Sequence, residues 1–335
     1  MGLVIETLVC IALVVLTGGW LSRTADVLAE KTGLGRTWVG AVLLSGATSL
    51  PELATGLGAI LLFNAPDLAV GGIFGSCLFN LLILAILDIF TGPEPLLTQA
   101  QISHGISAGL GCVMIGVAAL GMLSSDYGEP LLIGWFGLPS ALLLVLYGLS
   151  AYLLAQFELR RRTEVLEQES EMFQYDHITP RRAYIVFGLL ALAIVGLGIW
   201  LASIGDRVAE VTGLGESFVG ALLLSFATSL PEVVASITAI RLNAVDLAVS
   251  NVFGSNLFNM AILGVYDIAY IRGSLFRAIN PFVYLFSAIV AIVMTAIAMV
   301  GLIYRASRRS RLYFTWDVIS LIALYLIGMY VIYRN

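Results

Sequence analysis

The sequence predicts an all-α integral membrane protein of ten transmembrane helices, built as two inverted-topology five-helix repeats with kinked, Pro-interrupted helices at the midplane. Two observations predict this fold class. Hydrophobic residues make up 59% of the 335 residues and charged residues only 12%, whereas a soluble domain carries about 25% charged residues. One stretch, Ser45–Glu52, also recurs almost unchanged as Ser225–Glu232.

Apolar stretches long enough to span a bilayer recur along the whole chain. The first has neither a basic region before it nor a small-residue cleavage site after it, so we expect a retained span and not a signal peptide. The predicted spans lie near 3–21, 37–61, 68–90, 103–123, 131–156, 184–203, 217–240, 247–269, 280–303 and 313–333.

The basic residues predict the orientation. With the N-terminus outside, the positive-inside rule is satisfied, because four of the 17 basic residues (Arg207, Arg272, Arg277 and Arg334) fall outside and the others fall in cytoplasmic loops. The cytoplasmic ones are Arg23, Lys31, Arg36, Arg160, Arg161, Arg162, Arg181, Arg182, Arg241, Arg305, Arg308, Arg309 and Arg311. The polar stretch 157–183 is then a cytoplasmic linker between a first repeat, 1–156, and a second, 184–335.

The two halves match over 32–90 and 212–269. Thr32–Gly35 matches Thr212–Gly215 at an offset of 180, and Asp67–Asn80 matches Asp246–Asn259 at an offset of 179. Five spans separate equivalent points, so the second copy enters the membrane from the opposite side. Inverted repeats of this kind place a binding site near the midplane, where the halves meet.

Glu52 and Glu232 are the only charged residues deep within the predicted spans. A charged group there costs at least ~2.5–3.5 kcal/mol and is a functional-site hypothesis by default. Since no Lys or Arg lies at matching depth, we expect a mobile cation or protons to neutralise them.

Pro51 and Pro231 precede the two glutamates. A proline lacks the N–H that would bond the carbonyl four residues back, here Ala47 or Ala227. A freed carbonyl is costly in lipid unless something takes it up, so we expect it to help bind a cation.

Each half adds hydroxyl and amide oxygens near its glutamate and supplies no thiolate or imidazole ligand. Such hard ligands suit Ca²⁺ and Na⁺, and Mg²⁺ less well. Simpler interpretations remain open for single members: serines and threonines can bond back to their own helix, the asparagines can be packing amides, and a proline can be a kink alone. The candidate ligands of this kind are Glu52, Glu232, Thr48, Thr228, Ser49, Ser229, Ser76, Ser255, Asn80 and Asn259.

Other polar residues are expected to have ordinary roles. Asp67, Asp246, Asp88 and Asp267 are interpreted as helix caps or rim charges, and His104 and His177 as solvated. Cys10, Cys77 and Cys112 are interpreted as small core residues. The sequence contains no phosphate loop and no nucleophile with its base, so we expect neither an enzyme nor a cofactor. It shows no nucleic-acid patch and no evident obligatory protein partner; its surroundings are the lipid bilayer.

Around the two glutamates the chain resembles the sodium/calcium exchangers of the cation/calcium exchanger superfamily. Thr-Ser-Leu-Pro-Glu, followed in each half by Gly-Ser-x-Leu-Phe-Asn, is similar to that family's two alpha-repeats. The resemblance implies that Glu52 and Glu232 ligate Ca²⁺ with the main-chain carbonyls of Thr48 and Thr228. It implies Na⁺ sites at Ser49, Ser229, Ser76, Ser255 and the carbonyls of Ser45 and Ser225, with an amide ligand at Asn80 and Asn259.

The chain departs from the family pattern at several positions. Ala47 and Ala227 stand where Gly is frequent, and Cys77 stands where the second half has Asn256. Asn259 replaces the Asp of the potassium-dependent branch, so we expect no potassium co-transport. The short 157–183 loop lacks the large regulatory domains of animal exchangers, which implies a microbial-type protein.

The function expected from the resemblance is Na⁺/Ca²⁺ exchange by alternating access, with protons competing because two close, desolvated carboxylates attract them. The first helix of each half, 3–21 and 184–203, is the expected gate. A calcium/proton antiporter on the same scaffold and a passive cation channel are the alternatives.

Overall fold

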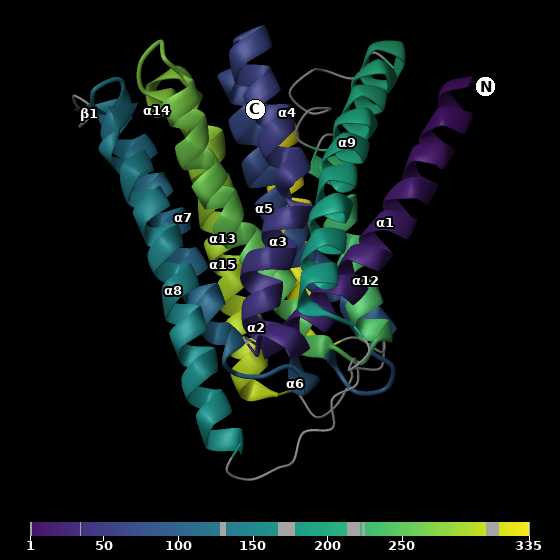
Figure 1. The fold of residues 1–335 in the computed structure, drawn as a ribbon. Helices are drawn as coiled ribbons and strands as arrows, with labels where there is room; N and C mark the ends of the chain where they lie inside the picture. Colours follow the sequence, from purple (N-terminus) through teal and green to yellow (C-terminus); the bar gives the residue numbers. More distant parts are fainter. Residues whose placement is uncertain are drawn as a thin grey trace.

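The computed structural model describes residues 2–33, 35–127, 132–166, 178–212, 222, 225–305 and 315–334. These residues form a bundle of long helices (Figure 1) with one two-stranded hairpin. The elements are α1 (Gly2–Thr32), α2 (Gly35–Trp38), the π-helical segment η1 (Val39–Leu44), α3 (Ser45–Thr48), α4 (Leu50–Phe63), α5 (Pro66–Phe90), α6 (Leu96–Gln99), α7 (His104–Tyr127), β1 (Leu132–Ile133), β2 (Phe136–Gly137), α8 (Leu138–Leu166), α9 (Pro180–Thr212), α11 (Ser225–Thr228), α12 (Leu230–Arg241), α13 (Val245–Ala269), α14 (Leu275–Ala278), α15 (Pro281–Tyr304) and α16 (Trp316–Arg334).

Seven helices of the described chain are long and apolar enough to cross a membrane. They coincide with seven of the ten predicted spans, and the protein is a multi-pass membrane protein. The three other predicted spans do not coincide with one long helix. The span 37–61 is broken into short helices, and 217–240 lies partly outside the described residues. The span 313–333 holds the shorter apolar helix Trp316–Ile332. Residues 213–221, which carry part of the predicted repeat, and 167–177 of the predicted linker also lie outside the described residues.

The helix carrying each glutamate is interrupted at a serine just before Pro51 or Pro231. Ser49 (φ −90°, ψ 8°) separates α3 from α4, and Ser229 (φ −87°, ψ 3°) separates α11 from α12. Each proline occupies the first turn of the following helix, where its missing N–H costs nothing. The interruption therefore sits one turn before each glutamate.

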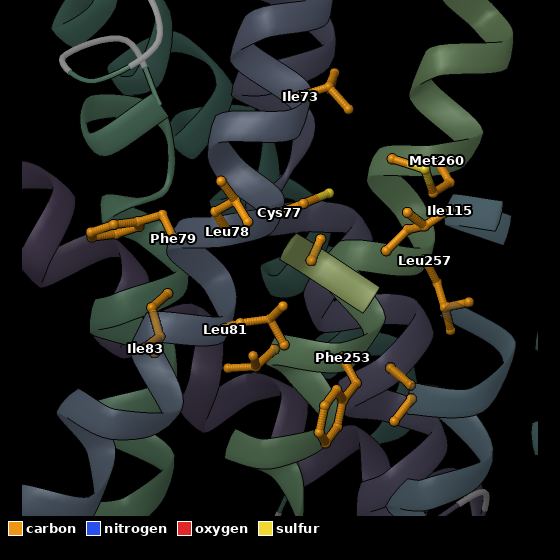
Figure 2. Packing of buried hydrophobic residues seen from close by; sticks show 14 of the residues in the cluster. Ile73, Cys77, Leu78, Phe79, Leu81, Ile83, Ile115, Phe253, Leu257 and Met260 are labelled. Atoms are coloured by element: carbon orange, nitrogen blue, oxygen red, sulfur yellow. The ribbon is translucent and has the colours of Figure 1, made fainter. Parts of the chain in front are cut away.

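The core is built around α5 and α13, which pack against each other. In Figure 2, Ile73, Leu78 and Leu81 of α5 lie in the same buried cluster as Phe253 and Leu257 of α13. The two helices are therefore the frame on which the interrupted helices rest, since α4 and α12 also pack against both.

Two aspartates show which helix ends lie side by side. Asp67, at the start of α5, accepts hydrogen bonds from the Asn280 N–H at 3.0 Å and the Tyr284 hydroxyl at 3.1 Å, at the start of α15. Asp246, at the start of α13, accepts one from the Gln101 N–H at 3.0 Å, just before α7. Figure 1 places the N-terminus, β1 and α14 at one end, here called the amino-terminal face, and α2 and α6 at the other, the opposite face.

The structure corrects the expectations for His104, Asp88 and Asp267. His104 is not solvated: it is fully buried, with Nε2 2.8 Å from Asp246 Oδ1. Asp88 and Asp267 are buried rather than at the rim, and their Oδ1 atoms accept hydrogen bonds from the N–H groups that begin α6 and α14. Asp67 is exposed and Asp246 half-buried, as expected for rim charges; both lie in the first turn of their helices and bond neighbouring segments, and neither is an N-cap. The buried groups are hydrogen-bonded, as buried polar groups usually are: His104 to a partner 142 residues away, and Asp88 and Asp267 each to a segment eight residues on. His177 lies outside the described residues.

Candidate cation site

The interrupted helices bring Glu52 and Glu232 to one buried region. Glu52 is only 4% exposed and Glu232 is 0% exposed. The hydroxyl of Ser49 donates a hydrogen bond to Glu232 Oε1 at 2.8 Å, and that of Ser229 donates one to Glu52 Oε1 at 3.0 Å. Each carboxyl group is thus bound by the serine that precedes the other one.

α5 contributes a third hydroxyl to this region. Ser76 Oγ lies 3.5 Å from Glu52 Oε1 and 3.2 Å from Ser229 Oγ. Ser255, the matching residue of α13, is fully buried, and its Oγ has no hydrogen-bond partner among the described residues. Of the four predicted serines, Ser49, Ser76 and Ser229 therefore contact the carboxyl groups. The structure gives no such contact for Ser255.

The amide pair lies between α5 and α13. Asn80 Nδ2 donates to Asn256 Oδ1 at 3.1 Å, and Asn259 Nδ2 lies 3.8 Å from Cys77 Sγ. Asn256 in turn donates to the main-chain carbonyl of Cys77 at 3.3 Å. Asn256 was not among the predicted site residues; the mismatch between Cys77 and Asn256 was the signal that could have drawn attention to it.

Within the described part of the chain, five oxygens of the predicted ligand set are buried without a hydrogen-bond partner. A buried polar atom normally has one, and an orphaned acceptor costs about 1–3 kcal/mol. Acceptors that face no donor are the atoms with which a protein binds a hard cation. The five are Glu52 Oε2, Glu232 Oε2, Asn80 Oδ1, Asn259 Oδ1 and Ser255 Oγ.

The threonine hydroxyls of the two segments bond back to their own helices. Thr48 Oγ1 donates to the carbonyls of Leu44 at 3.1 Å and Ser45 at 3.2 Å, and Thr228 Oγ1 donates to that of Ser225 at 3.4 Å. This back-bonding is usual for threonine in a membrane helix. The same hydroxyls also lie within reach of the carboxyl groups, that of Thr228 beside Glu52 and that of Thr48 beside Glu232.

Ser45 and Ser225 are placed one turn before the interruptions. Their carbonyls accept the N–H groups of Ser49 and Ser229, both at 3.0 Å. The Ser45 hydroxyl donates to the carbonyl of Ala41 at 2.7 Å, and the Ser225 hydroxyl to that of Gly72 at 3.1 Å. Each carbonyl also accepts from the threonine hydroxyl described above, so a cation that contacts it would have to displace one of these two donors.

The charge of the site has no protein counter-ion in the described part of the chain. Neither Glu52 nor Glu232 pairs there with a lysine or arginine. The described residues also contain no cluster of three or more His, Cys, Asp or Glu side chains. Two carboxyl groups among neutral oxygens fit a hard cation such as Ca²⁺ or Na⁺ and not a transition metal.

One contact at this site was not predicted. The Tyr266 hydroxyl, on α13, donates a hydrogen bond to the main-chain carbonyl of Glu52 at 2.5 Å. Comparing the halves gave no hint of it, because the matching residue in the first half is Leu87.

Known proteins resemble the chain over nearly all its length. The family model for the sodium/calcium exchanger protein matches residues 3–156 and 182–334. The inner membrane protein YrbG of Escherichia coli is 29% identical over 76% of both chains. The uncharacterized membrane protein MJ0091 of Methanocaldococcus jannaschii is 23% identical over 71% of this chain and 72% of its own.

Solved structures of the sodium-calcium exchanger NCX_Mj share the fold. The form soaked with 2.5 mM Na⁺ and 1 mM Sr²⁺ superposes with a TM-score of 0.69 over 98% of this chain and 97% of the other, at 18% identity. The human sodium/potassium/calcium exchanger 5 is 33% identical over a shorter region, 24% of this chain and 16% of its own. With its family model matched across both halves, the chain belongs to the sodium/calcium exchanger protein family.

Proposed function

We propose that the protein is a secondary active transporter that exchanges Na⁺ for Ca²⁺ by alternating access, with the cations competing at Glu52 and Glu232. The observation that carries this proposal is the reciprocal pair of hydrogen bonds from Ser49 to Glu232 and from Ser229 to Glu52. It holds two buried carboxyl groups in one oxygen-lined region where no described lysine or arginine pairs with them.

Charge balance explains why the two ions exclude each other. Two carboxylates supply a charge of −2, which one Ca²⁺ or two Na⁺ neutralise. A third Na⁺, as the family resemblance implies, is held by neutral oxygens and makes the exchange electrogenic. The orphaned oxygens of Ser255, Asn80 and Asn259 are the candidates for the neutral ligands. The proposal uses no cofactor; Ca²⁺ and Na⁺ are substrates and protons are competitors.

We further propose the full ten-helix, inverted arrangement, with halves 1–156 and 184–335. The support is the parallel order of elements: α4, α5, α6 and α7 are matched by α12, α13, α14 and α15. α5 starts beside α15, and α13 starts beside α7, at opposite faces of the bundle. The positive-inside rule then assigns the amino-terminal face to the outside and 157–183 to the cytoplasm.

The helices α1 and α9 are the proposed moving gate. They pack against each other; α1 also packs against α12, and α9 against α4. Sliding this pair would uncover one end of the site while covering the other. A state is stabilised only by ligands that bind it preferentially, so ion-filled sites should switch readily and half-filled ones should not.

Flux measurements in proteoliposomes test the proposal. Ca²⁺ uptake driven by an outward Na⁺ gradient, with opposite current, is the expected result. Uptake driven by a pH gradient without Na⁺ would instead establish the calcium/proton antiporter, and downhill flux without a counter-ion would establish the channel. Three uncharged oxygens without donors favour the sodium mode, because a proton carrier would need only the carboxyl groups.

A further inference from the structure

A cavity opens between the end of α7 and the junction of α14 with α15, at the amino-terminal face of the bundle (Figure 1). It has a volume of about 150 Å³, and its wall is mainly polar. A polar space of this size holds several water molecules, so it has room for a ligand of a few heavy atoms. Its described lining residues are Ser125, Phe276, Arg277, Ile279 and Pro281.

The other half of the chain fills the equivalent space with a side chain of its own. Arg305 stands at the end of α15 where Ser125 stands at the end of α7, at an offset of 180. The Arg305 guanidinium donates a hydrogen bond to the carbonyl of Ala100 at 3.4 Å, and Ala100 is the counterpart of Ile279. A serine is too short to make this contact, which leaves the cavity at the amino-terminal face.

Contacts at the same two junctions support this register. A Cβ atom at Gly121 of α7 would crowd Phe276 of α14, and one at Gly301 of α15 would crowd Leu97 of α6. The glycines are related by an offset of 180 and the side chains that they touch by an offset of 179. Each junction is therefore packed in the same way up to the cavity.

Charge decides what the cavity can hold. Arg277 lines it and carries a full positive charge, whereas its counterpart in the first half, Thr98, is neutral. The amino end of α15 at Pro281 adds a partial positive charge, and the carboxyl end of α7 adds a partial negative charge of similar size. Because these two nearly cancel and no described aspartate or glutamate lines the cavity, Arg277 sets the sign. The cavity favours an anion over a second cation.

Ser125 supplies a hydrogen-bond donor to the same space. The residue is only 5% exposed, and its hydroxyl bonds to no other residue in the described part of the chain. A buried polar group normally has a partner, so a hydroxyl left open to a polar cavity points to a ligand there. A hydroxyl and a guanidinium are both donors to phosphate oxygens, and the guanidinium can donate two parallel bonds.

The cavity lies where a bilayer would meet water. α14 contacts β2 of the hairpin that carries Trp135. The Trp135 ring is 48% exposed although its Nε1 donates to the carbonyl of Ile268 at 2.9 Å. Tryptophans of this kind are enriched at the membrane–water interface, which is also the depth of lipid phosphates.

We propose that this cavity is a binding site for a phosphate-type oxyanion, held by Arg277 and the Ser125 hydroxyl, with a phospholipid headgroup or free phosphate as its source. The anion joins the end of α7 to the α14–α15 junction, as Arg305 joins the end of α15 to the segment after α6. The site shares no residue with the candidate cation site, so it stands or falls independently of the proposed exchange.

Ligand binding to the purified, delipidated full chain tests the site without measuring transport. In neutral detergent and Ca²⁺-free buffer, thermal unfolding is followed while potassium phosphate or dioctanoyl phosphatidylglycerol is added, with potassium chloride matching the ionic strength. A ligand that binds only the folded chain raises the unfolding temperature. A rise with the lipid alone identifies a headgroup site, and a rise with both ligands identifies a site for any phosphate. No rise with either would overturn the proposal.

Single substitutions test whether the cavity residues hold the anion. Arg277→Gln should raise the apparent Kd about tenfold or more, the effect of one charge-assisted hydrogen bond, and Ser125→Ala about fivefold, the effect of a neutral one. Arg272→Gln removes the same charge from an exposed residue of the same face that does not line the cavity. This matched control should bind as the unaltered chain does. An equal Kd in Arg277→Gln and Arg272→Gln would overturn the site.

A transplant from the other half guards against misfolding. Ser125→Arg combined with Arg277→Thr installs the residues that stand at the matching positions, Arg305 and Thr98. The net charge is unchanged and the cavity is filled by the new side chain, so the variant should fold and lose phosphate binding. Retained binding in the folded variant would show that the ligand lies elsewhere.

Discussion

Ser49 binds the glutamate of the other half: its hydroxyl lies 2.8 Å from Glu232 Oε1 although 183 residues separate the two. The same relationship, with the halves exchanged, joins Ser229 to Glu52 at 3.0 Å. Neither half can therefore form its part of the site alone, and each carboxyl group is oriented by the opposite repeat.

Replacing either glutamate by glutamine should abolish exchange. Glu52→Gln or Glu232→Gln keeps the shape and removes one of the two negative charges, so Ca²⁺ would face only half the charge it needs. Na⁺-driven Ca²⁺ uptake into proteoliposomes measures the effect. Asp67→Asn, at an aspartate outside the site that bonds Asn280 and Tyr284, is the control and should retain uptake. Near-normal flux in either glutamine variant would refute the assignment.

Removing the bridging hydroxyls should weaken cation binding without preventing folding. Ser49→Ala or Ser229→Ala removes one hydrogen bond to a carboxyl group, worth about 1.5–3 kcal/mol if that group is charged. The apparent affinity for Na⁺ should fall in each, by similar factors because the two contacts are alike. Thr295→Val, which removes a hydroxyl that bonds back to Ala291 on α15, is the matched control. Unchanged Na⁺ activation curves in both serine variants would contradict the reciprocal site.

Restoring the missing N–H should impair transport while favouring the helix. Pro51→Ala supplies the donor that Ala47 lacks, so the interruption at Ser49 can close into regular helix. Thermal stability should be maintained or rise, and Ca²⁺ uptake should fall. Pro281→Ala, at the ordinary start of α15, should lower neither. Full transport in Pro51→Ala would show that the interruption is not needed.

Acid should inhibit the exchange competitively. Two buried carboxyl groups that share hydroxyl donors attract protons in the absence of a cation, and a protonated carboxyl no longer neutralises Ca²⁺. Lowering the pH should therefore raise the KM for Ca²⁺, and saturating Ca²⁺ should restore the maximal rate. The measurement is initial uptake at several Ca²⁺ concentrations and pH values; a fall in maximal rate at constant KM would speak against competition at the carboxyls.

Features that depend on local hydrophobic periodicity or on the internal duplication could be predicted from the sequence. The helices around α5 and α13, the interruptions at Pro51 and Pro231, and the candidate pair Glu52 and Glu232 all follow from such patterns. The repeat also pointed to both serines, although which carboxyl each would bind depends on how the halves pack.

Contacts that break the internal symmetry could not be predicted in this way. Tyr266 reaches the Glu52 carbonyl only because Gly56 leaves room for its hydroxyl, and its counterpart Leu87 carries no polar atom. His104 seemed a segment-edge residue, yet tertiary packing buries it beside Asp246. In both cases the partner is distant in sequence, and no periodic pattern encodes it.

Calcium binding to the purified protein tests the shared site most directly. Calorimetric titration should give one Ca²⁺ per chain, displaced by Na⁺, and the binding should be lost in Glu52→Gln and equally in Glu232→Gln. If either variant still bound one Ca²⁺ with the original affinity, the two carboxyl groups would not share a single ion and the account would be wrong.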